Sequence, residues 1–186
     1  MTIIEDNGEL WMSTARRVTS PNCDQRPEES AIDLLVIHAI SLPPKEYGGP
    51  YVEQLFTNSL SADEHPYFEE INHLRVSSHL LIRRDGELIQ FVPLNARAWH
   101  AGVSEFCGRK QCNDFSIGIE LEGCDDEKFT ESQYQQLAVV TETIRARWPN
   151  LQQNNIVGHS DIAPGRKTDP GPFFDWQYYR KLANIN

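Results

Sequence analysis

The alternation of apolar and polar positions along the chain predicts several short strands. Residues 34–37 form an unbroken apolar run, which is typical of a strand buried on both faces. The runs 78–82 and 87–92 are rich in strand-forming residues and flank an Asp-Gly pair, so they favour a hairpin. Apolar and small or polar residues alternate over 116–121, and the segment Asn155-Ile156-Val157 predicts a further short strand.

Helical periodicity is clearest after Thr130. This threonine and a glutamine three residues later match a capping box, apolar residues then recur on one helical face, and Pro149 ends the segment. A short helix is predicted after Pro50 and a closing helix over 175–182. The segment 61–72 is polar and acidic and contains a proline, so we expect a loop there.

Together these elements predict one α/β (α+β) domain. Strands and helices interleave without a regular βαβ alternation, so we expect a mixed central β-sheet flanked by helices. The chain has 186 residues, of which 39% are hydrophobic, and this is enough for a single domain, 1–186, with a substantial core.

Charge and targeting signals narrow the function. The net charge is −10, the opposite of what a general nucleic-acid or anionic-membrane binder needs, so neither is an expected partner. An acidic substrate would have to be held by a local cluster of arginine or lysine. The N-terminus has no signal-peptide pattern, and no apolar run approaches the ~20 residues of a membrane span. We therefore expect a cytoplasmic protein whose four cysteines are free thiols.

Two histidines and one aspartate stand where a metal site is often built. His38 and His159 each follow a predicted strand, and Asp169 lies ten residues after His159 on a loop stiffened by proline and glycine. Two imidazoles and a carboxylate that leave a fourth position open form a common catalytic zinc set. Spacing by itself also fits histidines that serve only the core or the surface.

Three segments together resemble one enzyme family. They are Leu35-Val36-Ile37-His38, the stretch Ser116-Ile117-Gly118-Ile119-Glu120-Leu121-Glu122-Gly123, and the stretch 158–171, Gly-His-Ser-Asp-Ile-Ala-Pro-Gly-Arg-Lys-Thr-Asp-Pro-Gly. These are similar to zinc-dependent N-acetylmuramoyl-L-alanine amidases of the Amidase_2 family, to which peptidoglycan recognition proteins are related. The resemblance runs from about residue 16 to residue 176.

The resemblance implies a role for each matching residue. His38, His159 and Asp169 match the ligands of one zinc ion per chain, and Glu120 matches the catalytic glutamate. Strand alternation agrees, because Glu120 points away from its apolar neighbours and can face a cleft, where a carboxylate can take and return a proton. Glu122 shares that face and is the rival for this role.

A further match concerns charge stabilisation. Lys167 lies two residues before Asp169, so in an extended loop both side chains point to the same side. Its ammonium can then stabilise a tetrahedral oxyanion. The alternative for Lys167 is a solvated surface lysine.

Substrate contacts are implied less directly. Arg75 matches an arginine that the family uses on the stem peptide, Trp99 can stack on a sugar or fill the core, and Arg166 is a further candidate for holding the peptide. The chain departs from the family pattern at Ala39, where asparagine is usual, and at Gln111, where arginine is usual. His79 and His100 are expected to be structural.

The resemblance implies a substrate as well. Segments 41–44, 97–102 and 112–116 are similar to members that cleave the amide between 1,6-anhydro-N-acetylmuramic acid and L-alanine in imported wall fragments. Such cleavage would also lower the signal that induces β-lactamase in bacteria with that circuit. We expect a monomer that binds this small muropeptide. The rival interpretations are a non-catalytic peptidoglycan-recognition module and an exported amidase acting on intact wall.

Overall fold

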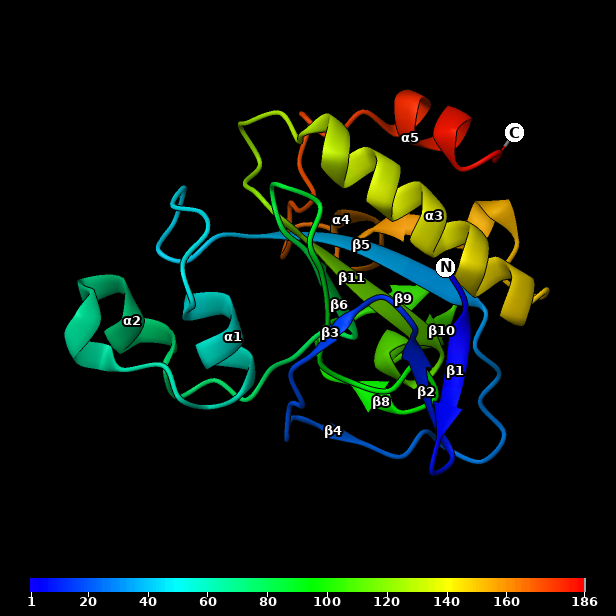
Figure 1. The fold of residues 1–186 in the computed structure, drawn as a ribbon, viewed down its shortest axis with the longest axis horizontal. Coiled ribbons are helices and arrows are strands. Elements are labelled where there is room, and N and C mark those ends of the chain that lie inside the picture. Colours follow the sequence, from blue (N-terminus) through cyan, green and yellow to red (C-terminus); the bar gives the residue numbers. More distant parts are fainter. Residues whose placement is uncertain (186) are drawn as a thin grey trace.

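A six-stranded mixed sheet forms the centre of the protein (Figure 1). The computed structural model describes residues 1–185. The strands lie in the order β12-β5-β11-β6-β7-β3, and only the β6–β7 pair is antiparallel. Their bounds are β3 Arg16–Arg17, β5 Leu34–Ile40, β6 Leu80–Ile82, β7 Leu88–Gln90, β11 Ser116–Glu122 and β12 Ile156–Gly158. The predicted mixed α/β sheet and the predicted hairpin are both confirmed.

The register of the three parallel strands fixes which side chains meet. Strand β11 pairs with β5 so that Glu120 lies opposite His38, and β12 pairs with β5 so that Gly158 lies opposite Ile37. His159 follows directly after Gly158. Because parallel strands end at the same edge of a sheet, all three polar side chains come to that edge.

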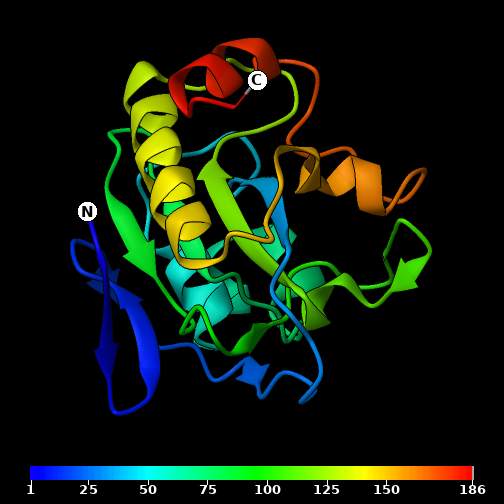
Figure 2. The same ribbon diagram turned by 90° about the vertical axis from the view of Figure 1, so that its right-hand side faces the viewer.

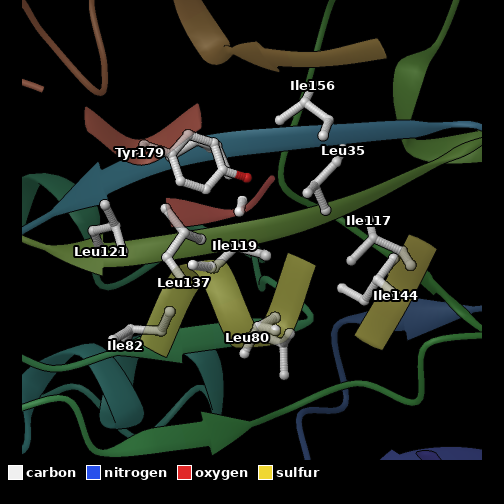
Figure 3. Packing of buried hydrophobic residues seen from close by; sticks show 14 of the residues in the cluster. Leu35, Leu80, Ile82, Ile117, Ile119, Leu121, Leu137, Ile144, Ile156 and Tyr179 are labelled. Atoms are coloured by element: carbon white, nitrogen blue, oxygen red, sulfur yellow. The ribbon is translucent and has the colours of Figure 1, made fainter. Parts of the chain in front are cut away.

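One face of the sheet is covered by two helices (Figures 1 and 2). Helix α3 (Glu131–Arg147) begins with the predicted capping box, in which Thr130 and Gln133 cap each other's backbone N–H. Its Leu137 and Ile144 belong to the same buried cluster as Ile117, Ile119 and Leu121 of β11 (Figure 3). Helix α5 (Trp176–Leu182) closes this layer through Tyr179, whose hydroxyl lies 2.7 Å from that of Thr141.

A helical arm packs near the opposite face. It contains α1 (Tyr51–Phe56), the 3-10 turn η1 (Ala62–Glu64) and α2 (Pro66–Ile71). The prediction of a loop over 61–72 is therefore wrong, because η1 and α2 occupy most of this segment. Proline occupies the first helical position, where its missing N–H costs nothing, and the His65 side chain accepts a hydrogen bond from the Tyr67 N–H. Phe68 of α2 is buried in a second apolar cluster, with Phe56 of α1 and Leu81 of β6, and this burial holds α2 in place.

Smaller elements complete the chain. An N-terminal hairpin, β1–β2, turns at Asn7-Gly8, where both residues have positive φ, as a two-residue hairpin turn requires. The predicted elements do not include this hairpin. The remaining elements are β1 Ile3–Asp6, β2 Glu9–Met12, β4 Cys23–Asp24, β8 Arg97–Ala98, β9 Glu105–Phe106, β10 Arg109–Lys110, η2 Cys112–Asp114, η3 Gln153–Asn155 and α4 His159–Ile162. Within residues 1–185, none of the helices has the length and apolar content needed to cross a bilayer.

Candidate active site

Four predicted site residues meet at the carboxyl edge of the sheet. His38 lies on β5, Glu120 lies beside it on β11, and His159 begins α4 directly after β12. Asp169 reaches them from the following loop, which is tied back to α4 because the Ser160 N–H donates a 3.0 Å hydrogen bond to the Asp169 carbonyl. Strand pairing therefore places three of the groups, and a short loop supplies the fourth.

The two histidines and Asp169 form a compact triangle of ligand atoms. His38 Nδ1 lies 3.0 Å from His159 Nδ1, and each nitrogen lies 3.1 Å from Asp169 Oδ2. A tetrahedral zinc ion with bonds of about 2.0–2.1 Å separates its ligand atoms by about 3.3 Å. The spacing of this triangle therefore fits a small cation with little rearrangement, and these three residues can hold a metal ion.

Protonation of the imidazoles also suits a cation. His159 Nε2 lies 3.1 Å from the carbonyl oxygen of Ala101, which can only accept, so Nε2 is the donor and Nδ1 is the nitrogen that carries the lone pair in the neutral ring. Burial lowers the pKa of His38 to about 4, so this ring is neutral at pH 7. Burial alone would raise the pKa of Asp169, but hydrogen bonds with His159 and His38 outweigh it and leave a carboxylate.

Glu120 is a buried carboxyl group without a full set of partners. Its side chain lines the same cleft as the triangle, the residue is 8% exposed, and Oε2 has no hydrogen-bond partner among the described residues. Burial raises the pKa of Glu120 well above its ordinary value, the charge of Asp169 adds to this, and Lys167 opposes it. A buried carboxyl group with a raised pKa and a free oxygen is suited to exchange a proton with a reacting group in the cleft.

Lys167 supplies the positive charge in the cleft. It lines the cleft together with Asp169, and within residues 1–185 no carboxylate lies within ion-pair distance of its ammonium. An ammonium without a partner can approach an oxygen that becomes negative during a reaction.

Glu122, the rival of Glu120, has a structural position. Its Oε1 accepts hydrogen bonds from the Gly48 N–H at 2.6 Å and from Arg83 at 3.2 Å, and its Oε2 accepts one from the Arg84 N–H at 3.1 Å. It does not line the cleft. Its two oxygens tie the loop before α1 and the β6–β7 turn to the end of β11.

The cleft has a polar floor and an apolar wall. Its volume is about 310 Å³. The floor holds the metal-ligand triangle, Glu120 and Lys167, whereas the wall comes largely from the helical arm and its flanking loops: Leu42, Leu55, Phe56, Tyr67, Ile71, Leu74 and Val76. Sequence reasoning missed this wall, because no local pattern tells which apolar residues of an arm face a cleft. A larger cavity of about 690 Å³, beside Arg26 and Trp148, contains none of the predicted site residues.

The predicted substrate contacts lie at different distances from this cleft. Trp99 and Ala39 line it. Arg75 is exposed just outside it, between the lining residues Leu74 and Val76, and its guanidinium makes only 3.3 Å contacts to nearby backbone carbonyls.

Two other predicted positions are not part of the lining. Arg166 is held by the carbonyl oxygens of Ala101 and Val103, each 2.7 Å from Nη2, so its guanidinium serves a loop behind the triangle. Gln111 is exposed, and its backbone has a left-handed conformation directly before η2.

A site of this kind, at one edge of a mixed α/β sheet, is typical of metal-dependent hydrolases. Comparison with known proteins gives the family. Residues 28–172 match the Amidase_2 family of N-acetylmuramoyl-L-alanine amidases, and the chain belongs to this family.

Individual relatives agree with this assignment. The 1,6-anhydro-N-acetylmuramyl-L-alanine amidase AmpD of Salmonella typhimurium (strain SL1344) is 56% identical over 184 residues, covering 99% of this chain and 97% of the relative. The crystal structure of an Se-Met AmpD derivative, 57% identical, superposes with a TM-score of 0.91 over 96% of this chain and 98% of that one.

A more distant relative was solved with a ligand. The amidase AmiD from E. coli, in complex with the substrate anhydro-N-acetylmuramic acid-L-Ala-D-gamma-Glu-L-Lys, is 28% identical with a TM-score of 0.61. The match covers 97% of this chain and 65% of that one.

Replacement of Glu120 and replacement of Glu122 by glutamine should have opposite effects on the free energy of unfolding. In the unfolded chain Glu120 ionises near a pKa of about 4.3, whereas burial raises its pKa in the folded chain. The folded state therefore binds the proton more tightly, and stability is lost as pH rises from the unfolded toward the folded pKa. Metal-free Glu120→Gln should be more stable than the parent at pH 8, by about 1–3 kcal/mol, with the difference shrinking toward pH 4.

Glu122→Gln is the matched control for this comparison. It removes a charge that Arg83 and two backbone N–H groups bind, so it should lower the free energy of unfolding at pH 8 by about 1–3 kcal/mol. Urea unfolding of both variants at pH 4, 6 and 8 measures the effect. Destabilisation of Glu120→Gln at pH 8 would contradict the account of its burial.

Proposed function

We propose that this chain is a zinc-dependent amidase that hydrolyses the amide bond between 1,6-anhydro-N-acetylmuramic acid and L-alanine in wall muropeptides. The observation that carries the proposal is the triangle of His38, His159 and Asp169 beside a buried, partly unpartnered Glu120. Membership of the amidase family and the 56% identity to an AmpD that acts on this bond support the substrate.

The metal-binding role falls to the two histidines and Asp169. A zinc ion held there supplies Lewis-acid chemistry, which polarises a carbonyl and lowers the pKa of water. Two neutral nitrogens and one carboxylate leave a single positive charge on such a site, and borderline nitrogen ligands favour zinc over magnesium or calcium. We therefore propose one zinc ion per chain.

Glu120 is proposed as the group that moves the proton. It accepts a proton from the water that attacks the carbonyl carbon, and it then donates this proton to the nitrogen of L-alanine as the C–N bond breaks. The products are the carboxylic acid of the anhydro-sugar and a peptide with a free amine. Lys167 stabilises the negative oxygen that forms between these two steps.

Substrate binding is proposed to use both parts of the cleft. Trp99 offers an aromatic face to the sugar, and the apolar wall of the helical arm lies beside it. Arg75, exposed at the rim, is placed to bind a carboxylate of the stem peptide. Arg166 would have to give up its contacts with two carbonyl oxygens to do the same, so we rank it below Arg75.

The same proposal includes a monomer in the cytoplasm that acts on wall fragments rather than on intact wall. Light scattering and cell fractionation test the two expectations. A recognition module without activity is less favoured, because all three ligand positions and Glu120 are present together in one cleft.

Product analysis tests the reaction directly. The protein, incubated with purified anhydro-muropeptide, should release free peptide and anhydro-N-acetylmuramic acid in mass spectra, and a chelator should abolish this. Glu120→Gln should keep its zinc while kcat falls by about 10²–10⁴-fold, because the amide cannot accept the proton. Near-normal turnover in this variant would transfer the role to another group, and Glu122→Gln serves as the control that should stay active.

Metal content tests the ligand assignment separately. Elemental analysis of the purified protein should find about one zinc per chain. Asp169→Ala removes the only charged ligand of the triangle and should lose most of the metal. Full zinc occupancy in this variant would show that Asp169 is not a ligand.

Kinetics test the proposed carboxylate contact. The chain carries a net charge of −10, so long-range attraction cannot recruit an anionic substrate, and a short-range contact must hold it. Arg75→Ala should raise KM by about tenfold, equivalent to about 1.4 kcal/mol, with a smaller effect on kcat because the contact is equal in ground and transition states. An unchanged KM in Arg75→Ala would move the contact to another arginine.

A further inference from the structure

We propose that His100 is a positioning residue that fixes the ring orientation and tautomer of His38, and that the adjacent Ala101 carbonyl does the same for His159. This inference rests on the proposed metal site. It assigns to two consecutive residues of a loop the task of presenting Nδ1 of both imidazoles to the cation. From the sequence, only a structural role is expected for His100.

The contact with His38 lies on the side of the ring away from the triangle. His38 Nε2 lies 2.9 Å from His100 Nδ1, and the two rings meet edge to face with centroids 5.0 Å apart. When Nδ1 of His38 holds a cation, its Nε2 must carry the proton. His100 Nδ1 is then the acceptor of that N–H.

The other nitrogen of His100 contacts a serine hydroxyl, which can accept a hydrogen bond. His100 Nε2 lies 3.1 Å from the hydroxyl oxygen of Ser116. A neutral His100 that accepts at Nδ1 must carry its own proton at Nε2, and the Ser116 oxygen accepts a hydrogen bond from it. These two hydrogen bonds link Ser116, His100 and His38 in series. Only one arrangement of protons along this series leaves Nδ1 of His38 free for a metal.

The contact with His159 uses the next residue of the same loop. His159 Nε2–H donates a 3.1 Å hydrogen bond to the Ala101 carbonyl oxygen, and Arg166 Nη2 donates another to that oxygen at 2.7 Å. Arg166 therefore holds the carbonyl in place. Partners on the outer nitrogen of a ligand histidine generally orient the ring and strengthen metal binding.

The loop itself is anchored at both residues. The side-chain oxygen of Asn113 accepts hydrogen bonds from the N–H groups of His100, at 3.1 Å, and Ala101, at 2.8 Å. Its placement therefore does not depend on the metal.

Strand β11 leaves space for the His100 ring. A Cβ at Gly118 would lie only 2.6 Å from His100 Cγ and Nδ1, so no larger residue fits there. Ser116, Gly118 and Glu120 lie on the same face of β11, because successive side chains of a strand point to opposite faces. The first contacts His100, the second makes room for it, and the third lines the cleft.

Zinc affinity distinguishes positioning from a packing role. His100→Leu keeps apolar bulk but removes the acceptor, and should raise the zinc dissociation constant by about 10–100-fold, measured by competition with a chelator. His100→Asn places its side-chain oxygen near the former Nδ1 and should recover most of that loss. The absorption spectrum of cobalt(II)-substituted protein should change in His100→Leu and return toward that of the parent in His100→Asn.

His79→Leu is the matched control. His79 is fully buried, and its ring packs against His100 at 5.7 Å between centroids, but it contacts none of the three ligand residues. This variant should lose thermal stability and keep a zinc dissociation constant close to that of the parent. An equal loss of affinity in His79→Leu and His100→Leu would overturn the proposal in favour of general packing.

The remaining outcomes separate this inference from the proposed function. If the parent binds zinc and His100→Leu binds it equally well, the inference fails and the metal site stands. If the parent binds no zinc, both fail. Should His100→Leu not fold, Ser116→Ala replaces it, since loss of the oxygen removes the acceptor of the His100 Nε2–H. Its zinc dissociation constant should also rise, and an unchanged value would overturn the proposal.

Discussion

The parallel pairing of β5 with β11 and β12 is the constraint on which the site depends. It brings the carboxyl ends of three strands to one edge and sets Glu120 opposite His38. A shift of one residue in this register would turn the side chains to the other face of the sheet. The pairing that holds the sheet together therefore also places His38, Glu120 and His159. Only Asp169 and His100 are brought to the site by loops.

The two faces of β11 have different roles: one packs in the apolar core and the other carries residues of the site. Ile117, Ile119 and Leu121 pack against the layer of α3 and α5 as part of the large apolar cluster. The opposite face carries Ser116, Gly118 and Glu120, which serve the site and leave one carboxyl oxygen of Glu120 without a partner. Burial of that group opposes folding, and the apolar face compensates for it.

Several elements could be predicted because their signals are local. The capping box at Thr130, the Asp-Gly hairpin and the apolar run before His38 depend on neighbours within a few residues. The helix α2 was missed because its polar composition resembles a loop, and it is held by burial of one side chain, Phe68, in a distant cluster. Such burial cannot be read from a short window of sequence.

The sequence by itself determined five strands of the central sheet, the long helix and, through the family resemblance, which residues to place at the edge of the sheet. Only the tertiary structure decided how these residues are supported. In the folded chain Glu122 accepts a hydrogen bond from Gly48, and Arg166 donates one to the Ala101 carbonyl. His100 contacts the outer nitrogen of His38. Local patterns encode hydrogen bonds and periodicity along one segment, whereas these contacts join segments more than sixty residues apart and depend on how the loops pack over the finished sheet.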